Sequence, residues 1–301
     1  MSTLPTSEKS TTVSRQLRRL RLLISHGMFA PLPENSVCKR ATTVDELREA
    51  YRLVHDIYVD QKYILPTESK MRVRAFEVSP DTATFITRFN GATVGVFSCI
   101  MDSPELRLPT DKVFPDELAQ LRDAGAVLCE FSNQVILPEC RSTSATTELM
   151  KIMFAHIWFH NITDAVCAVS PNQIEFFRLI GFTQIGDVKS YSDVVYDPVV
   201  LMQLPDVQNI LGKPKRPGLA LEEFRYQYFT ADNPYMSIIP FWDAMVERLF
   251  ANGAAVQSLF AECITEFEML PYEEREAIAQ YISLESGLLD SGRESYSDTV
   301  I

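Results

Sequence analysis

A glutamate within an apolar stretch is the residue of this sequence best suited to chemistry. Glu130 lies inside residues 127–137, which we expect to form an extended central strand. Burial disfavours the charged form of a carboxyl group and raises its pKa, so that the group can take up a proton near neutral pH. Glu130 is therefore predicted to be a general base. The alternative is a buried glutamate that pairs with an arginine.

Cysteines and histidines offer a second kind of chemistry. Cys129 adjoins Glu130 and Cys140 follows the same strand, so a cysteine nucleophile is an alternative that needs a base close by. The histidines available for that role are His55, His156 and His160. The six cysteines are spread singly, without a CxxC pair or a histidine at metal-binding spacing. We therefore expect reduced thiols and no metal site.

The charge of the chain limits its partners. A formal net charge of −12 argues against non-specific nucleic-acid binding. Arginines alternate with leucines between residues 15 and 24, and the predicted amphipathic helix could pack on the domain or contact anionic lipid or an acidic carrier. No apolar run approaches the roughly 20 residues of a membrane span, and no secretory signal is recognised. We expect a cytoplasmic protein, with peripheral contact at the inner membrane face left open.

The elements that would position Glu130 follow from periodicity and turn residues. A capping box at residues 43–46 starts a helix, and Asn90-Gly91 joins two strands in a hairpin. Residues 60–80 carry basic residues and show no period, so we expect a surface loop. After the strand at 127–137 come a helix at 146–161, a strand at 164–169, a helix at 171–179 that Gly181 ends, and an extended stretch reaching Met202. This order predicts an α/β (α+β) fold with a mixed central sheet flanked by helices.

Two segments resemble a known superfamily. Residues 170–182 resemble the late helix-to-strand segment of GNAT acyltransferases, in which an aromatic pair is followed by three residues and then Gly-Phe. Residues 130–141 resemble the central strand and acyl-carrier loop of bacterial long-chain N-acyl amino acid synthases and acyl-homoserine-lactone synthases, with matches at Glu130, Ser132, Pro138 and Arg141. Residues 51–59 resemble the helix that opens these synthases. The resemblance covers roughly residues 40–204.

Three departures from these families bear on the chemistry. Asn133 stands where they usually have arginine. Ser144 and Thr146 stand where coenzyme-A-using relatives have glycines that let backbone amides approach a diphosphate, which favours a phosphopantetheine arm instead. Phe177 belongs to the aromatic pair in which many GNAT enzymes have a tyrosine acid, a role that Tyr191 or Tyr196 could take.

The resemblance implies transfer of a medium or long fatty acyl chain from a thioester to the amine of an amino acid or similar small molecule. The donor would be acyl carrier protein, with its acyl-phosphopantetheine, or acyl-CoA, and no permanently bound cofactor is expected. The expected catalytic residues are Glu130 and Ser132. The expected donor-site residues are Val135, Ile136, Arg141, Ser144, Thr146, Asn172 and Phe177, with a backbone N–H near Val135 or Ile136 as oxyanion donor. The expected acceptor-site residues are Arg52, Tyr58, Arg72 and Arg74.

Other functions and partners stay open at this point. An acyl-homoserine-lactone-type synthase, an acyl-CoA-dependent GNAT enzyme and a non-catalytic acyl- or carrier-binding module are alternatives, and so is a homodimer. An acidic carrier would require one positive face made by Lys62, Lys70, Arg72, Arg74 and Arg141. We expect an N-terminal arm at 1–39, the acyltransferase domain at 40–204 and an all-helical extension at 205–301 that ends in a loose tail.

Overall fold

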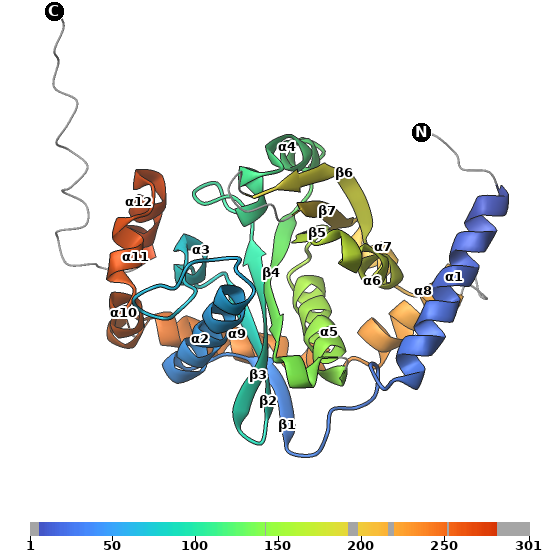
Figure 1. Ribbon diagram of the computed structural model, residues 1–301, viewed down its shortest axis with the longest axis horizontal. Coiled ribbons are helices and arrows are strands. Elements are labelled where there is room, and N and C mark those ends of the chain that lie inside the picture. Colours follow the sequence, from blue (N-terminus) through green and yellow to red (C-terminus); the bar gives the residue numbers. More distant parts are fainter. Residues whose placement is uncertain (1–5, 142, 192–197, 216–219, 252, 282–301) are drawn as a thin grey trace, which may run out of the picture.

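A mixed sheet of seven strands lies at the centre of the computed structural model, which describes residues 6–281 without 142, 192–197, 216–219 and 252 (Figure 1). The strands are β1 (Ser36–Arg40), β2 (Ala83–Phe89), β3 (Ala92–Met101), β4 (Leu128–Ile136), β5 (Asp164–Val169), β6 (Thr183–Ser190) and β7 (Pro198–Leu204). Their spatial order is β1-β2-β3-β4-β5-β7-β6. Only the β4–β5 pair of the described sheet is parallel. The predicted mixed sheet is confirmed.

Helices cover both faces of this sheet (Figure 1). The main helices are α1 (Thr6–Ser25), α2 (Val44–Asp60), α3 (Ala75–Val78), α4 (Pro115–Asp123), α5 (Ser144–Phe159) and α6 (Ile174–Ile180). On one face, α5 shares an apolar cluster with Phe97 and Phe131; on the other, α2 packs on Ile86, Val96 and Val135. Successive side chains of β3 and β4 point to opposite faces of the sheet, so both strands contribute residues to both apolar clusters.

The C-terminal third is helical, as the sequence predicts. It comprises α7 (Val207–Ile210), α8 (Ala220–Tyr226), α9 (Ile239–Ala251), α10 (Gly253–Ala261), α11 (Ile264–Glu268) and α12 (Tyr272–Tyr281). These helices run from α8 beside α1, past α5, to α12 beside α3 (Figure 1). Trp242 joins the cluster under α5, and Phe260 and Phe267 join the cluster under α2. The expected loose tail at 285–301 lies outside the described residues.

Two short elements were not predicted. Strand β1 carries Lys39 and Arg40 in only five residues, too few to display a clear period, and it forms the sheet edge beside β2. Helix α3 occupies four residues of the segment that the sequence suggested to be loop throughout. Among the described residues, no helix is both long and apolar enough to cross a membrane.

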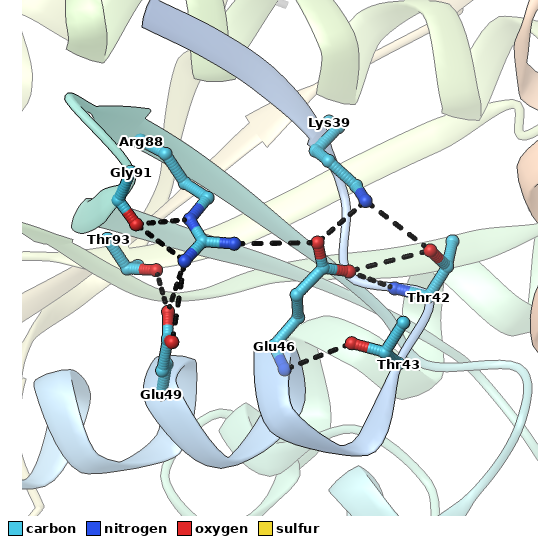
Figure 2. A network of polar contacts seen from close by, with 8 residues as sticks. All are labelled: Lys39, Thr42, Thr43, Glu46, Glu49, Arg88, Gly91 and Thr93. Atoms are coloured by element: carbon cyan, nitrogen blue, oxygen red, sulfur yellow. Dashed lines mark hydrogen bonds and ion pairs between the residues drawn. The ribbon is translucent and has the colours of Figure 1, made fainter.

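A polar network fixes the start of α2 against the sheet (Figure 2). The Thr43 hydroxyl accepts a hydrogen bond from the Glu46 N–H at 3.2 Å, as a capping box requires. The Glu46 carboxylate, however, accepts from the Thr42 N–H at 2.9 Å and from Lys39 Nζ at 2.7 Å, rather than from the Thr43 N–H. The predicted box is thus half formed, because a lysine on β1 draws the carboxylate aside.

Candidate active site

The parallel strands β4 and β5 separate after a short stretch of pairing. They are in register at three positions, from Leu128↔Asp164 to Glu130↔Val166, although β4 continues to Ile136 and β5 to Val169. A cavity of about 850 Å³ lies where they diverge, and it is also lined by the end of α2, by the loop that follows it and by the start of α6. Its size is in the range of small-molecule sites in proteins.

A β-bulge shapes the cavity wall on β4. Between the pairs Val96↔Val135 and Ser98↔Ser132, β4 holds one residue more than β3. Asn133 lies in this bulge and has a φ of 53°. Asparagine tolerates this backbone conformation better than most residues do. Its buried amide donates to Glu77 Oε1 at 2.9 Å and to Ser98 Oγ at 3.3 Å. The residue that departs from the family pattern therefore holds the bulge in place.

Most of the predicted site residues line this one cavity. They are Tyr58, Arg72, Arg74, Glu130, Ser132, Val135, Ile136, Arg141, Thr146, Asn172 and Phe177. Arg52 does not line it: its exposed guanidinium lies 3.6 Å from Glu262 of the C-terminal extension. Ser144 does not line it either, because its hydroxyl donates to the Pro31 carbonyl at 3.3 Å. The structure thus brings together residues that are more than 100 positions apart in the sequence.

Glu130 is held by a threonine and not by an arginine. The residue is 2% exposed, and Oε2 accepts hydrogen bonds from the Thr110 N–H at 2.9 Å and the Thr110 hydroxyl at 2.6 Å. Burial raises the pKa of Glu130 to about 7, against the lowering effects of the Thr110 bonds and the Arg74 charge. The carboxyl group can therefore exchange a proton near neutral pH. Sequence reasoning missed Thr110, which is 20 positions away.

Two arginines in the cavity differ in their partners. Arg74 pairs with the fully buried Glu77, with a second contact from its own N–H to Glu77 Oε2 at 2.7 Å. Burial raises the pKa of Glu77, but the charges of Arg74 and Arg72 and the hydrogen bonds from Arg74 and Asn133 together outweigh this effect, and the net shift is downward. Arg72 has a buried Nε without a hydrogen-bond partner, and no described residue forms an ion pair with it. Burial and the neighbouring Arg74 lower the pKa of Arg72 to about 10, so it remains a cation.

Comparison with protein families identifies the chain. The family described as N-acyl amino acid synthase FeeM matches residues 49–205, which is more than half of the 301 residues. The chain belongs to this family. It is an acyltransferase, and the matched range contains β2–β7, α5, α6 and every predicted residue that lines the cavity. The resemblance noted in the sequence is confirmed.

Several solved structures of acyltransferases are similar to this chain. The N-acyl amino acid synthase FeeM from uncultured soil microbes is 25% identical, with a TM-score of 0.50, over 56% of this chain and 90% of that chain. A CoA-dependent acyl-homoserine lactone synthase, BjaI, is 16% identical with a TM-score of 0.45, over 66% of this chain and 92% of its own. An acyl-CoA N-acyltransferase from Pseudomonas aeruginosa is 16% identical with a TM-score of 0.41, over 56% of this chain and 97% of its own. No curated protein matches.

The cysteines of this acyltransferase are poorly suited to act as nucleophiles. Cys129 is fully buried in the core, and burial together with the adjacent Cys99 raises its pKa well above the ordinary value. Cys140 does not line the cavity. Cys167 does, but burial raises its pKa too. A cysteine nucleophile is therefore disfavoured. Tyr191 lines the cavity, whereas Tyr196 lies outside the described residues.

The first turn of α5 is covered by the segment that follows α1. The Thr143 hydroxyl accepts from the Ala145 N–H at 3.3 Å, and the hydroxyls of Ser144 and Thr147 donate to the carbonyls of Pro31 and Met28. One amide of the helix start is thus already capped, and two carbonyl oxygens lie close to this turn. A diphosphate gains less from such a helix start than from a bare, glycine-rich one.

Proposed function

We propose that this acyltransferase joins a medium or long fatty acyl group, carried as a thioester, to the α-amine of an amino acid. The observation that carries the proposal is the presence, in one cavity, of a carboxyl group whose pKa lies near 7 and an arginine that forms no direct ion pair with a described residue, although Glu77 lies near enough to act on its charge. The family description supports an amino acid as the acceptor. An amino acid at neutral pH offers an ammonium to the first group and a carboxylate to the second.

The reaction begins when the acceptor loses a proton. The Glu130 carboxylate takes that proton, directly or through one water molecule, and the free amine attacks the thioester carbonyl carbon. The tetrahedral intermediate collapses to the amide as the carbon–sulfur bond breaks, and the departing thiolate takes the second proton that the attacking nitrogen has to lose. The departing thiolate needs little help, because a thiol has a pKa of about 8.5. Ser132 accepts a hydrogen bond from Arg74 Nη2 at 3.4 Å, which leaves its own proton free to donate towards the reacting atoms.

Strand β4 supplies a backbone donor for the oxyanion. The Leu137 N–H donates to the Val94 carbonyl on β3 at 2.8 Å, so alternation along an antiparallel pair turns the Val135 N–H towards β3 as well. The N–H of Ile136 then faces away from β3, towards the cavity side where β5 has diverged. We therefore prefer Ile136 to Val135 as the oxyanion donor.

The acceptor and the acyl donor would enter from different walls. Arg72 would receive the carboxylate of the amino acid, while Arg74 is neutralised by Glu77 and orients Ser132. Tyr58 would complete the acceptor wall. Thr146, Asn172 and Phe177 also line the cavity, and there the pantetheine arm and the start of the acyl chain would lie.

We favour acyl carrier protein over coenzyme A as the donor. The covered first turn of α5 leaves less room for a diphosphate, whereas a phosphopantetheine arm has a single phosphate that Arg141, exposed at the cavity, could meet. Of the five residues expected to form a positive face, Arg72, Arg74 and Arg141 line the cavity, whereas Lys62 and Lys70 are exposed and do not line it. The exposed arginines of α1 offer a further basic surface.

Reconstitution with matched donors tests this proposal. Purified protein is incubated with a mixture of amino acids and either acyl carrier protein or coenzyme A charged with the same fatty acid, and mass spectrometry measures N-acyl amino acids. We expect product from the carrier-bound donor at a kcat/KM at least ~10-fold above that of acyl-CoA. An equal or greater rate with acyl-CoA would overturn the choice of donor, and no product from either would overturn the proposed reaction.

A further inference from the structure

A second polar cluster lies away from the acyl cavity, where α9 contacts α5. His156 and His160 are one helical turn apart, on α5 and at its C-terminal end, and Asp243 lies on α9. None of the three lines the cavity. Their nearest ligand atoms all lie within 4.8 Å of one another. The spacing of the cysteines predicts no metal site, but that prediction does not consider this cluster, in which Asp243 follows His160 only after 83 positions.

The buried histidine of this cluster lacks partners. His156 is 2% exposed, and neither of its ring nitrogens has a hydrogen-bond partner among the described residues. Leaving a buried polar group unpaired is costly, and native proteins seldom do so. Burial lowers the pKa of His156, and the charges of Arg40 and His160 add to this effect. An imidazole nitrogen that has no hydrogen-bond partner is available to bind a metal ion.

We propose that His156, His160 and Asp243 bind a divalent transition-metal ion, for which Zn²⁺ is the best fit. Two imidazole nitrogens and one carboxylate oxygen form a typical zinc ligand set, and histidines four residues apart on a helix point to the same side. Ligand atoms of a tetrahedral zinc site are about 3.4 Å apart, so the side chains have to close in slightly. The side chain of His160 is 32% exposed, which leaves an entry path and room for water as fourth ligand.

Arg40 would determine both the orientation of the Asp243 carboxylate and the affinity of the site for a metal ion. The 5% exposed guanidinium of Arg40 pairs with Asp243 Oδ1, while Asp243 Oδ2 lies 3.1 Å from His160 Nε2. The metal would replace this second contact, and Arg40 would keep the carboxylate in place from behind. The positive charge of Arg40 lies close to the site and makes metal binding weaker than it would be at a site without that charge. Since Arg40 ends β1, the ion would fasten α9 of the extension to α5 and the sheet.

Calorimetric titration with ZnCl₂ tests the site on the full-length, chelator-treated protein. Asp243→Asn keeps the shape of the carboxylate and removes its charge, and His156→Phe fills the same buried volume without nitrogens. His26→Gln, which changes an exposed histidine after α1, is the matched control. We expect one ion per chain for the wild type and the control, binding at least ~10-fold weaker in the two site variants, and a wild-type Tm raised by roughly 3–5 °C at saturating zinc.

Cobalt substitution identifies the ligands. Bound Co²⁺ should give visible d–d absorption without the near-ultraviolet band of a cobalt–thiolate bond. No saturable binding by the wild type, unchanged binding by Asp243→Asn, or a thiolate band from one of the cysteines would each overturn the proposal. If His156→Phe does not fold, Asp243→Asn decides the question alone. None of these readouts depends on acyltransferase activity.

Discussion

The buried carboxyl group of Glu130 lowers the stability of the folded chain at alkaline pH. Burial raises its pKa to about 7 from an ordinary value of about 4.5, so the folded chain holds this proton over a pH range in which the unfolded chain has lost it. The contribution of this group to stability is therefore fully present below about pH 4.5 and is lost as the pH rises through 7. The cost at alkaline pH comes from the same burial that suits Glu130 to its proposed role as a base.

Replacing Glu130 with glutamine should stabilise the fold at alkaline pH. The amide oxygen of the new side chain would still accept hydrogen bonds from Thr110, but the side chain would carry no charge. We expect Glu130→Gln to be more stable than the wild type by about 1–3 kcal/mol at pH 8 and nearly equal to it at pH 5. Thermal unfolding followed by circular dichroism measures the difference. A lower Tm for the variant at pH 8 would contradict this account of Glu130.

Arg72 should determine the affinity for the acceptor. Arg72→Met removes a charged partner of the acceptor carboxylate, so KM for the amino acid should rise by roughly 10–100-fold while kcat changes much less. For the amide of the same amino acid, which lacks that carboxylate, Arg72→Met should change KM only slightly. Arg52→Met is the matched control, because Arg52 lies outside the cavity. Steady-state kinetics that show equal losses for acid and amide would refute the assignment.

At the residue scale, the sequence indicates which side chains are buried but not which residues they contact. Glu130 could be predicted to be buried because apolar residues surround it in the chain. Its partner Thr110 could not be predicted, nor could the contact from Asn133 to Glu77 across 56 positions, because both depend on how the sheet closes. The unpaired Arg72 is visible only once the neighbouring carboxylates are placed.

The end of α6 illustrates how a local signal fixes an element. Gly181 has φ of 116°, and a Cβ there would come within 2.7 Å of the Ile210 side chain. Phe182 then enters the core beside Phe177 and Phe131, as the sequence predicts. The Gly-Phe step thus stops the helix and anchors it next to the cavity.

Two glycine substitutions separate backbone strain from steric conflict. Gly91 has φ of 83° with nothing within 4 Å of a built Cβ, whereas Gly181 adds the conflict with Ile210. We expect Gly91→Ala to cost about 1 kcal/mol and Gly181→Ala about 2–4 kcal/mol of unfolding free energy. Urea denaturation of both variants gives the comparison. Equal losses of unfolding free energy in the two variants would mean that α7, which carries Ile210, moves away from the added methyl group without an energetic cost.

Elements with strong local signals were predictable and short ones were not. The Asn90-Gly91 hairpin and the period of α5 are encoded in adjacent residues. Strand β1 and helix α3 are too short to carry a pattern, and the bulge at Asn133 depends on pairing with β3. The bulge matters most for function, because it lies in the wall that presents Ser132 and Ile136.

For the whole molecule, the helical extension is part of the core. Phe229 and Trp242 pack under α5, and Phe260 and Phe267 pack under α2, so the extension completes apolar clusters on both faces of the sheet. We propose that the boundary near residue 205 separates segments of sequence rather than independently folding units. The sequence predicted the helices of this extension, but their docking depends on long-range packing that periodicity does not describe.

Truncation after residue 205 should therefore abolish cooperative folding. The shortened chain would expose the surfaces under α5 and α2 that the extension covers. We expect it to be insoluble or to lack a sharp thermal transition, whereas the full chain unfolds in a single transition by calorimetry. A soluble fragment with a sharp transition would show that the acyltransferase part is an independent domain.

The central claim is that this molecule makes N-acyl amino acids with Glu130 as the base. The most direct measurement is mass spectrometry of lipid extracts from bacteria that express the wild-type chain or Glu130→Gln at equal soluble levels. The account predicts new N-acyl amino acids with the wild type and a reduction of ~100-fold or more with the variant. No new lipid from abundant wild-type protein, or equal amounts from both chains, would contradict it.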